Sequence, residues 1–258
     1  MVKRAGRNLR PQAWLIFCLF SINPLSSQAQ EVTVGMGNFE PYFIEQGTSG
    51  IFTDLIHAVF KKMPNHQPKF LFGRSNNRLW HDFKQNNVDA VSNLFDSVEL
   101  DACRSDPIFR FRDVAVTKTS ADFKIKKIAD LAGKYIVTFQ GARSFFGNEF
   151  EKTTHSKSGS YREVSRPSWQ VQVLGSDSAD VSVGDMFIFL HTLKETKNLN
   201  LSASDFTFHD IFPAIYTRMG FRDPQICQLF NQALKKIRAN GQYEKIYSSY
   251  LRQLNPSH

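Results

Sequence analysis

The sequence predicts an α/β protein made of two units, in each of which short strands and helices alternate. Strands are indicated by short runs rich in Val, Ile and Phe, and helices by apolar residues three and four positions apart. This order occurs over about residues 31–95 and again over about 114–193. Because successive strand–helix–strand units usually form a parallel sheet, we expect two mainly parallel sheets flanked by helices.

The first unit contains three strands and two helices. On its first helix Leu55, Ile56, Val59 and Phe60 share one face, and Pro64 ends the pattern. The predicted elements are a strand at 31–36, a helix at 53–63, a strand at 69–73, a helix at 76–86 and a strand at 88–95.

The second unit repeats this order, and two helices follow it. Asp223 is the expected N-cap of a long helix, with Pro224 in its first turn and Gly241 at its end. The elements are strands at 114–118, 135–139, 161–165 and 179–183, and helices at 128–133, 141–152, 168–174, 186–193, 224–240 and 243–251.

The N-terminus has the order of a secretory signal peptide: basic residues, the apolar run WLIFCLFSI, and then small residues at Ser27 and Ala29. A membrane anchor needs about 20 apolar residues, and Asn23 and Pro24 interrupt this run. We therefore expect residues 1–29 to be removed by cleavage near Ala29, and the mature protein to be exported to the periplasm.

Composition and motifs argue against several function classes. The net charge of +8 is not gathered into a basic block with interleaved aromatics, so nucleic-acid binding has little support. The nucleophile-elbow, H-E-x-x-H, C-x-x-C and P-loop motifs are missing, and no two histidines are four residues apart. We expect no metal, no cofactor and no enzymatic activity.

Two cysteines, Cys103 and Cys227, remain after cleavage. In an oxidising compartment they could form a disulfide, or they could stay as two buried thiols, and the sequence leaves both alternatives open.

Two predicted strands end in acids, in DAVSNLFD at 89–96 and DVSVGDMF at 180–187. A carboxylate at the end of a buried strand is costly unless a cation or several donors satisfy it. Asp185 could meet a ligand cation, or it could cap the apolar helix that follows, and both roles are compatible.

Taken together, these segments resemble the family-3 extracellular solute-binding proteins. The resemblance rests on VTVGM, FEPY, GIFTDL, VDAVS, SDPI, DLAGKYIVTFQG, ADVSVGD and NGQYEKIY, which occur in the family's order over about 31–251. It implies a two-lobed periplasmic-binding-protein fold of type II, with two crossover hinge strands. The implied lobes are 30–116 with 212–258, and 117–211.

The resemblance also implies a ligand site between the lobes. Asp185 corresponds to the acid that grips a ligand ammonium, with a helix N-terminus at 140–144 presented to a ligand carboxylate. Arg143 could instead point into solvent, and Phe39 and Phe52 could instead pack in the core. The implied ligand-binding residues are Phe39, Phe52, Asn93, Asp96, Gln140, Arg143, Ser144 and Asp185.

One departure from the family weakens the prediction of an amino-acid ligand. The family's amino-acid receptors carry an Arg shortly after the third strand, where this chain reads FDSVELDACRSDPIF, and Arg104 is displaced from that position. Without this Arg a free α-carboxylate loses its main partner. The ligand is then a cation or zwitterion held by Asp96 and Asp185, or an anion held by Arg143.

We therefore expect a monomeric periplasmic protein that captures a small polar ligand for an ABC importer or a membrane sensor. One alternative is a divergent sensory or non-transport relative of the same fold. Another is an enzyme similar to cyclohexadienyl dehydratases, and the missing Arg argues against it too.

Overall fold

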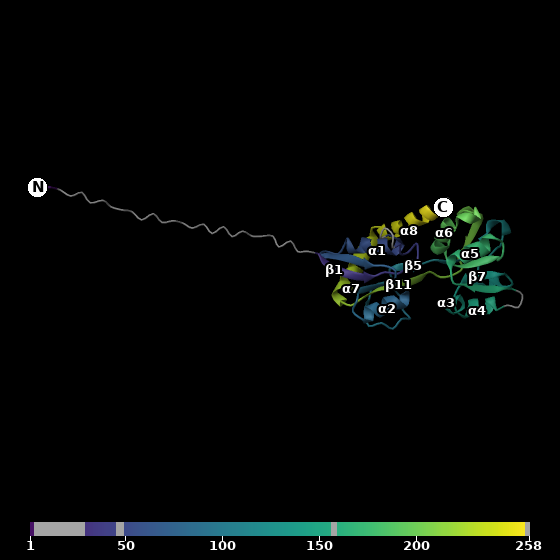
Figure 1. Ribbon diagram of the computed structural model, residues 1–258, viewed down its shortest axis with the longest axis horizontal. Coiled ribbons are helices and arrows are strands. Elements are labelled where there is room, and N and C mark those ends of the chain that lie inside the picture. The colour runs from purple at the N-terminus through teal and green to yellow at the C-terminus, as the bar shows by residue number, and fades with distance from the viewer. Residues whose placement is uncertain (3–28, 45–48, 156–158, 256–258) are drawn as a thin grey trace.

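The computed structural model describes residues 1–2, 29–44, 49–155 and 159–255. The predicted signal peptide lies almost wholly outside the described residues. Figure 1 shows two lobes next to each other, each with a sheet between helices. Among the described residues, no helix combines the length and the apolar composition needed to cross a bilayer.

The first lobe is built on a mixed sheet. Its strand order is β2-β1-β3-β11-β4, and β5 also pairs with β11. The pairings β1–β2 and β1–β3 are parallel, whereas β11 runs antiparallel to β3, β4 and β5. The strands are β1 (Gln30–Gly35), β2 (His66–Leu71), β3 (Ala90–Leu94), β4 (Cys103–Arg104), β5 (Phe109–Phe111) and β11 (Ile215–Phe221).

Helices from both ends of the chain cover this sheet. Asp223 caps α7 by accepting a hydrogen bond from the Gln225 N–H, as predicted. The C-terminal helix α8 packs on α1 and α7 and reaches α6 of the second lobe (Figure 1). The helices are α1 (Ile51–Phe60), α2 (Asn76–Lys84), α7 (Pro224–Ala239) and α8 (Gln242–Leu254).

The second lobe has a five-stranded sheet with the order β10-β6-β9-β7-β8. Here β7 runs parallel to β8 and β9, and β6 runs antiparallel to β9 and β10. The strands are β6 (Asp113–Lys118), β7 (Ile136–Phe139), β8 (Tyr161–Val164), β9 (Val181–Asp185) and β10 (Phe206–His209), and the helices are α3 (Ala142–Phe146), α4 (Asn148–Thr154), α5 (Pro167–Gly175) and α6 (Met186–Glu195).

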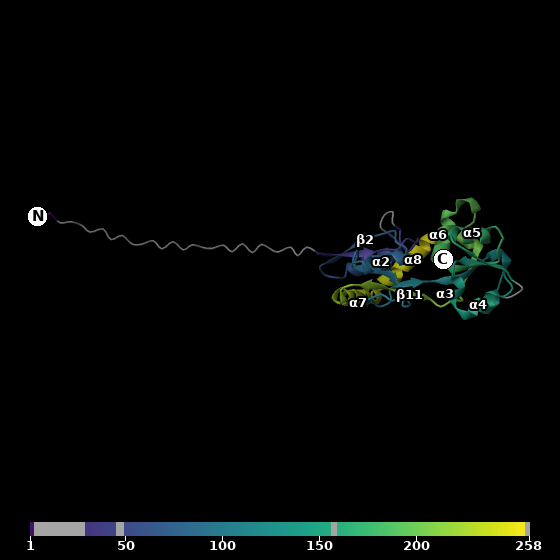
Figure 2. The ribbon, with the colours of Figure 1, turned by 60° about the horizontal axis from the view of Figure 1, so that its bottom comes forward.

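Two short segments connect the lobes, one around Arg112 between β5 and β6, the other at 210–214 between β10 and β11. The Arg112 guanidinium forms an ion pair with Asp210, so the two crossovers are tied together. The second view shows the two lobes joined by these thin connections (Figure 2). The lobe limits predicted above remain a proposal. In the structure, β5 before Arg112 belongs to the first sheet, and β6 after it belongs to the second.

The two-lobed α/β fold predicted from the sequence is confirmed, and most helices and strands lie where expected. The predicted helix at 141–152 is two helices, because Gly147 has a φ of 80° that breaks the run between α3 and α4. Strand β11 was not predicted, and it supplies the antiparallel partner of β3.

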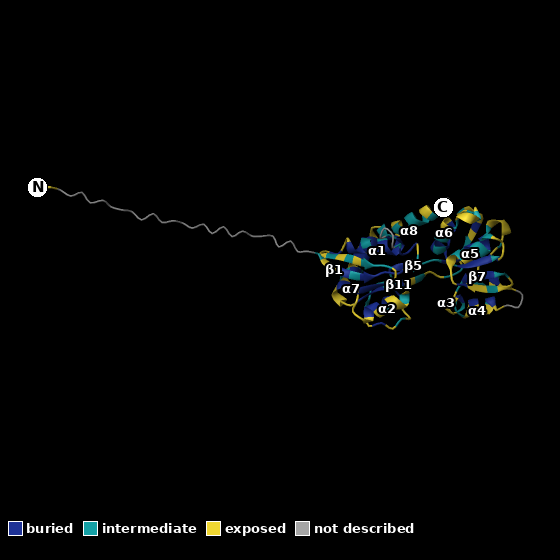
Figure 3. Ribbon diagram, viewed as in Figure 1, coloured by how far each residue is buried: buried dark blue, intermediate teal, exposed yellow. Residues whose placement is uncertain are grey.

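Buried strands form the centre of each lobe, and exposed positions lie on the outer helix faces (Figure 3). In the first lobe Gly50 brings the segment around Tyr42 close to α1. Its φ is 120°, and a Cβ there would lie 2.5 Å from the Tyr42 carbonyl oxygen, so only glycine fits. The Phe52 N–H then donates to that carbonyl, which fixes Tyr42 at the lobe interface.

A disulfide joins Cys103 of β4 to Cys227 of α7, with the Cα atoms 6.2 Å apart. It attaches the C-terminal return helix to the edge of the first sheet, across a sequence separation of 124 residues.

Candidate functional site

A pocket of about 200 Å³ lies where β7 and β9 end and β6 begins, on the side of the second sheet that faces the first lobe. Ligands of α/β proteins commonly bind at this carboxyl edge of parallel strands. The lining residues are Phe95, Phe111, Asp113, Val116, Phe139, Phe145, Pro167, Gln170, Ser182, Gly184, Asp185, Ile188 and Phe189.

Both lobes contribute aromatic rings to this pocket. Phe95 follows β3 and Phe111 ends β5, and their rings are nearly parallel, at 7° with centroids 6.5 Å apart. In the second lobe, Phe139 and Phe145 meet edge to face with centroids 5.4 Å apart. Five of the lining residues are phenylalanines, so the walls are mainly apolar.

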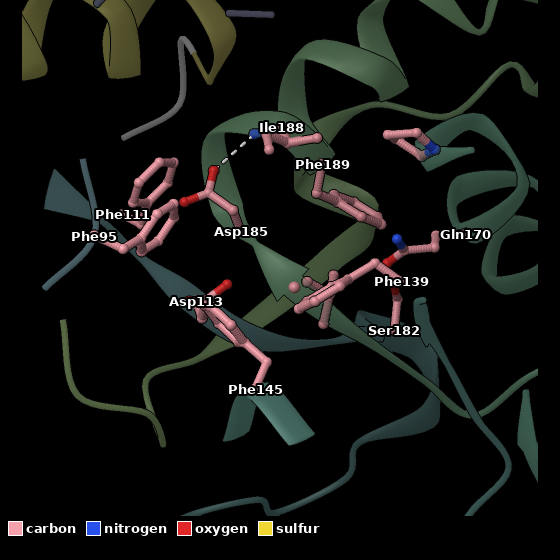
Figure 4. A pocket seen from close by; sticks show the side chains of 13 residues that line it. Phe95, Phe111, Asp113, Phe139, Phe145, Gln170, Ser182, Asp185, Ile188 and Phe189 are labelled. Atoms are coloured by element: carbon pink, nitrogen blue, oxygen red, sulfur yellow. Dashed lines mark hydrogen bonds between the residues drawn. The ribbon is translucent and has the colours of Figure 1, made fainter. Parts of the chain in front are cut away.

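Two carboxyl groups lie on one wall. Asp113 and Asp185 are directly opposite each other on the antiparallel strands β6 and β9. Residues paired in this way place their side chains on the same face, with Cβ atoms roughly 5 Å apart. In Figure 4 both lie on the same side of the pocket as Phe95 and Phe111, with Phe139, Gln170 and Ser182 on the other side.

Asp185 is fully engaged by the protein. Its Oδ1 accepts the Ile188 N–H at 3.0 Å, which caps α6, and its Oδ2 accepts the Tyr42 hydroxyl at 2.7 Å and the Arg112 N–H at 2.9 Å. Burial raises the pKa of Asp185 to about 6, although these hydrogen bonds favour the charged form and lower it.

Asp113 has the opposite environment. It is only 4% exposed, and its Oδ2 accepts no hydrogen bond from the described residues. Burial, together with the charge of Asp185, raises the pKa of Asp113 to about 8. A carboxyl group that is buried without a partner and lines a pocket is typical of a functional site.

A polar pair forms part of the opposite wall. The Ser182 hydroxyl donates to Oε1 of Gln170 at 3.2 Å, which leaves the amide N–H groups of Gln170 available to the pocket. Gly184 lies beside Gln170, and a Cβ there would be 3.4 Å from Gln170 Oε1. Any larger side chain at this position would enter the pocket.

A family model confirms the assignment suggested by the sequence. Residues 32–253 match the model described as bacterial extracellular solute-binding proteins, family 3. The chain belongs to this family. No curated protein sequence matches it significantly.

Solved structures of similar fold include binding proteins and a sensor domain. An ancestral cationic amino acid solute-binding protein has a TM-score of 0.68 at 18% identity, covering 87% of this chain and 96% of that chain. Substrate-binding domain 2 of Lactococcus lactis GlnP, in an open conformation, has a TM-score of 0.65 at 19% identity, covering 86% of this chain and 95% of that chain. A histidine kinase sensor domain with similarity to periplasmic binding proteins has a TM-score of 0.60 at 17% identity, covering 87% of this chain and 97% of that chain.

The eight residues that the family resemblance implied lie in different places. Asp185 alone among them lines the pocket. Phe52 is fully buried and stacks on Phe109, with ring centroids 4.3 Å apart, in the core of the first lobe. Phe39 is partly buried against Tyr42, Phe43 and Phe111.

After β3, Asn93 and Asp96 are both paired within the protein. The buried amide of Asn93 accepts the Thr217 hydroxyl at 2.8 Å and donates to Asn76 at 3.1 Å. Asp96 is exposed and pairs with Arg218 at 2.7 Å. It is Phe95, between them, that reaches the pocket.

In the second lobe, Gln140 and Ser144 are exposed and do not line the pocket, whereas their neighbours Phe139 and Phe145 do. Arg143 is directed to the far side of α3. Its guanidinium lies 3.8 Å from the centroid of the Tyr161 ring and donates to Oγ1 and the carbonyl of Thr154.

The displaced Arg104 does not replace the family's carboxylate-binding Arg. Its guanidinium donates to the carbonyls of Phe95 and Val98, so it stabilises the turn after β3. The 13 lining residues include no Lys, Arg or His.

Sequence reasoning did not find Asp113, Gln170, Ser182 or the aromatic lining. One signal was present in the run FRFRD at 109–113, since residues that alternate in a strand point the same way. Phe109 is buried in the core and Phe111 extends the same row into the pocket. Asp113 is two residues further on, so it continues the alternation of Phe109 and Phe111.

Proposed function

We propose that this family member is an exported solute-binding protein that captures one small ligand in the pocket between its lobes. The observation that carries the proposal is a pocket lined by side chains of both lobes and containing a buried carboxyl group, one oxygen of which has no hydrogen-bond partner among the described residues. Such a pocket is suited to a ligand that arrives while the lobes are apart and is enclosed when they close about the two crossovers.

The protein would act as a monomer in the periplasm and hand its ligand to an inner-membrane ABC permease or a sensor. Support for this comes from the extracellular family to which the chain belongs and from the signal-like N-terminus. N-terminal sequencing of the protein from a periplasmic extract tests the export step. We expect the chain to begin at Gln30, and an intact Met1 in a membrane fraction would contradict export.

We also propose that the ligand is bound and released unchanged. An elimination of the dehydratase type needs a cation that holds the substrate carboxylate, and no Lys, Arg or His lines the pocket. Mass spectrometry of each bound compound, recovered after incubation, would reveal any conversion.

Binding is tested with the mature chain, residues 30–258, after unfolding and refolding to remove any ligand that co-purifies. Thermal shift against amines, amino acids, carboxylates and neutral aromatics identifies candidates, because a ligand specific for the native state raises the unfolding temperature. Calorimetry then gives the Kd of each.

A variant that fills the pocket locates the site. Gly184→Leu places a side chain between Gln170 and Phe139, and we expect affinity to fall at least about tenfold. Ala132→Leu adds a similar volume at an exposed position of the same lobe and is the control. Unchanged affinity in a folded Gly184→Leu protein, or no binding by any class of compound, would contradict the proposed function.

A further inference from the structure

We propose, building on the function proposed above, that the ligand is a small aromatic amine without a carboxylate, and that Asp113 receives its ammonium group. The ring would lie among the phenylalanines, and the nitrogen would sit against the carboxyl group of Asp113.

The aromatic lining of the pocket indicates that the ligand has an apolar, aromatic body. Rings come from the end of β3, the end of β5, the end of β7, and helices α3 and α6. Edges and faces of several rings thus border one cavity, which favours a flat aromatic guest. Ring faces also attract a cation, so an ammonium on an aromatic body is favoured over an anion of the same size.

The charge of the ligand follows from Asp113. Asp113 is 4% exposed, and within the described part of the chain its Oδ2 has no partner; such a group costs free energy, and a ligand cation would compensate for it. Asp185 is less able to bind the ligand ammonium, because three protein donors already occupy its two oxygens.

A carboxylate on the ligand would be unfavourable. It would enter a pocket with two acids and without Lys, Arg or His among the lining residues. Three arginines discussed above are engaged elsewhere: Arg112 pairs with Asp210, Arg104 binds backbone carbonyls, and Arg143 stacks on Tyr161. Amino acids should therefore bind less tightly than the amines that lack their carboxylate.

The protonation state of Asp113 should make amine affinity depend on pH. In the ligand-free protein the raised pKa of Asp113 keeps its proton at neutral pH, and an arriving ammonium displaces that proton. The titratable groups facing Asp113 are Asp185 of β9 and Tyr42 of the first lobe, and the Arg112 side chain beside it is neutralised by Asp210. Amine affinity should rise by up to about tenfold per pH unit between pH 6 and 8 and then level off.

The test uses three matched series on the mature protein. The amines are benzylamine, phenethylamine and tryptamine; the neutral counterparts are benzyl alcohol, 2-phenylethanol and tryptophol; the zwitterions are phenylglycine, phenylalanine and tryptophan. We expect at least one amine to bind at least about tenfold more tightly than both its alcohol and its amino acid, since a hydrogen bond to a charged group is worth about that factor.

Asp113→Asn keeps the shape of the side chain and removes its charge. It should weaken amine binding by about tenfold or more, leave alcohol binding nearly unchanged, and abolish the rise with pH. The control is Asp122→Asn, which removes a carboxylate that is 80% exposed from the same lobe, at a left-handed position that Asn tolerates.

The outcomes separate this inference from the function on which it rests. If amino acids or carboxylates bind and the three amines do not, the amine assignment is overturned and the binding function stands. Amine binding that Asp113→Asn leaves unchanged overturns the role of Asp113. If no compound of any class binds, both proposals fail.

Discussion

The hydroxyl of Tyr42 donates a 2.7 Å hydrogen bond to Oδ2 of Asp185, and this bond joins the two lobes across 143 residues of sequence. Tyr42 is fully buried beside Phe52 of the first lobe, and Asp185 caps α6 of the second. The same carboxylate therefore ends a strand, begins a helix and holds the lobe interface.

Tyr42→Phe should destabilise the protein by about 1–3 kcal/mol, because it removes one hydrogen bond to a buried charged group and keeps the ring. Urea denaturation followed by circular dichroism measures the change in unfolding free energy. Tyr216→Phe is the control, since that residue is 46% exposed and its hydroxyl can bond to water. Equal losses in the two variants would show that the Tyr42–Asp185 bond contributes nothing specific.

Removing Asp113 should change how stability depends on pH. Its folded pKa of about 8 lies above the ordinary value of 3.8, so between these values unfolding releases a proton. The free energy of unfolding therefore falls as pH rises through this window, by at most about 1.4 kcal/mol per pH unit, and the contribution is complete below about pH 4.

Asp113→Asn lacks this contribution, because its side chain cannot ionise. We expect Asp113→Asn to gain stability relative to the parent protein as pH increases from 5 to 8, measured by urea denaturation at each pH. A difference between the two proteins that stays constant over that range would argue against an abnormal carboxyl group.

The disulfide between Cys103 and Cys227 should be a major source of stability. Closing a loop of more than a hundred residues typically contributes about 2–5 kcal/mol, and here it fixes α7 to β4. The doubly substituted Cys103→Ser, Cys227→Ser protein should melt at a lower temperature than the parent. Dithiothreitol should lower the melting temperature of the parent and leave that of the variant unchanged, and no response in the parent would mean that the bond is not formed in solution.

Arg143→Ala should affect stability more than ligand affinity. It removes the contact with Tyr161 and two hydrogen bonds to Thr154, all on the side of α3 away from the pocket lining. We expect a loss of about 1–2 kcal/mol and an unchanged Kd for the best ligand. If the Kd rises tenfold while stability is kept, the ligand-binding role implied by the family resemblance would be restored.

The sequence predicted the alternation of strands and helices well, because each element carries its own local signal. Apolar spacing identified α1, and Asp223, Pro224 and Gly241 marked the limits of α7. Strand β11 was missed because its strand character depends on antiparallel pairing with segments more than a hundred residues away.

The ligand-binding residues implied by the sequence stay a prediction, and the pocket has a partly different lining for a specific reason. After β3 and at the start of α3 the family resemblance implied the polar residues Asp96, Gln140 and Ser144, whereas their neighbours Phe95, Phe139 and Phe145 line the pocket. A shift of one position along a strand or turn directs a side chain to another face. Asp113 was not considered because only the pairing of β6 with β9 brings it opposite Asp185.

The most direct test of the account counts the protons released when an amine binds. The amine of the three that binds most tightly is titrated into the mature protein at pH 7 in two buffers with different ionisation enthalpies, and the difference in heat gives that number. An alkyl ammonium keeps its own proton at this pH, so any released proton comes from the protein. We expect close to one proton per amine bound, and none for Asp113→Asn. Binding without proton release, or equal release from both proteins, would contradict the assignment of Asp113 as the group that receives the ligand.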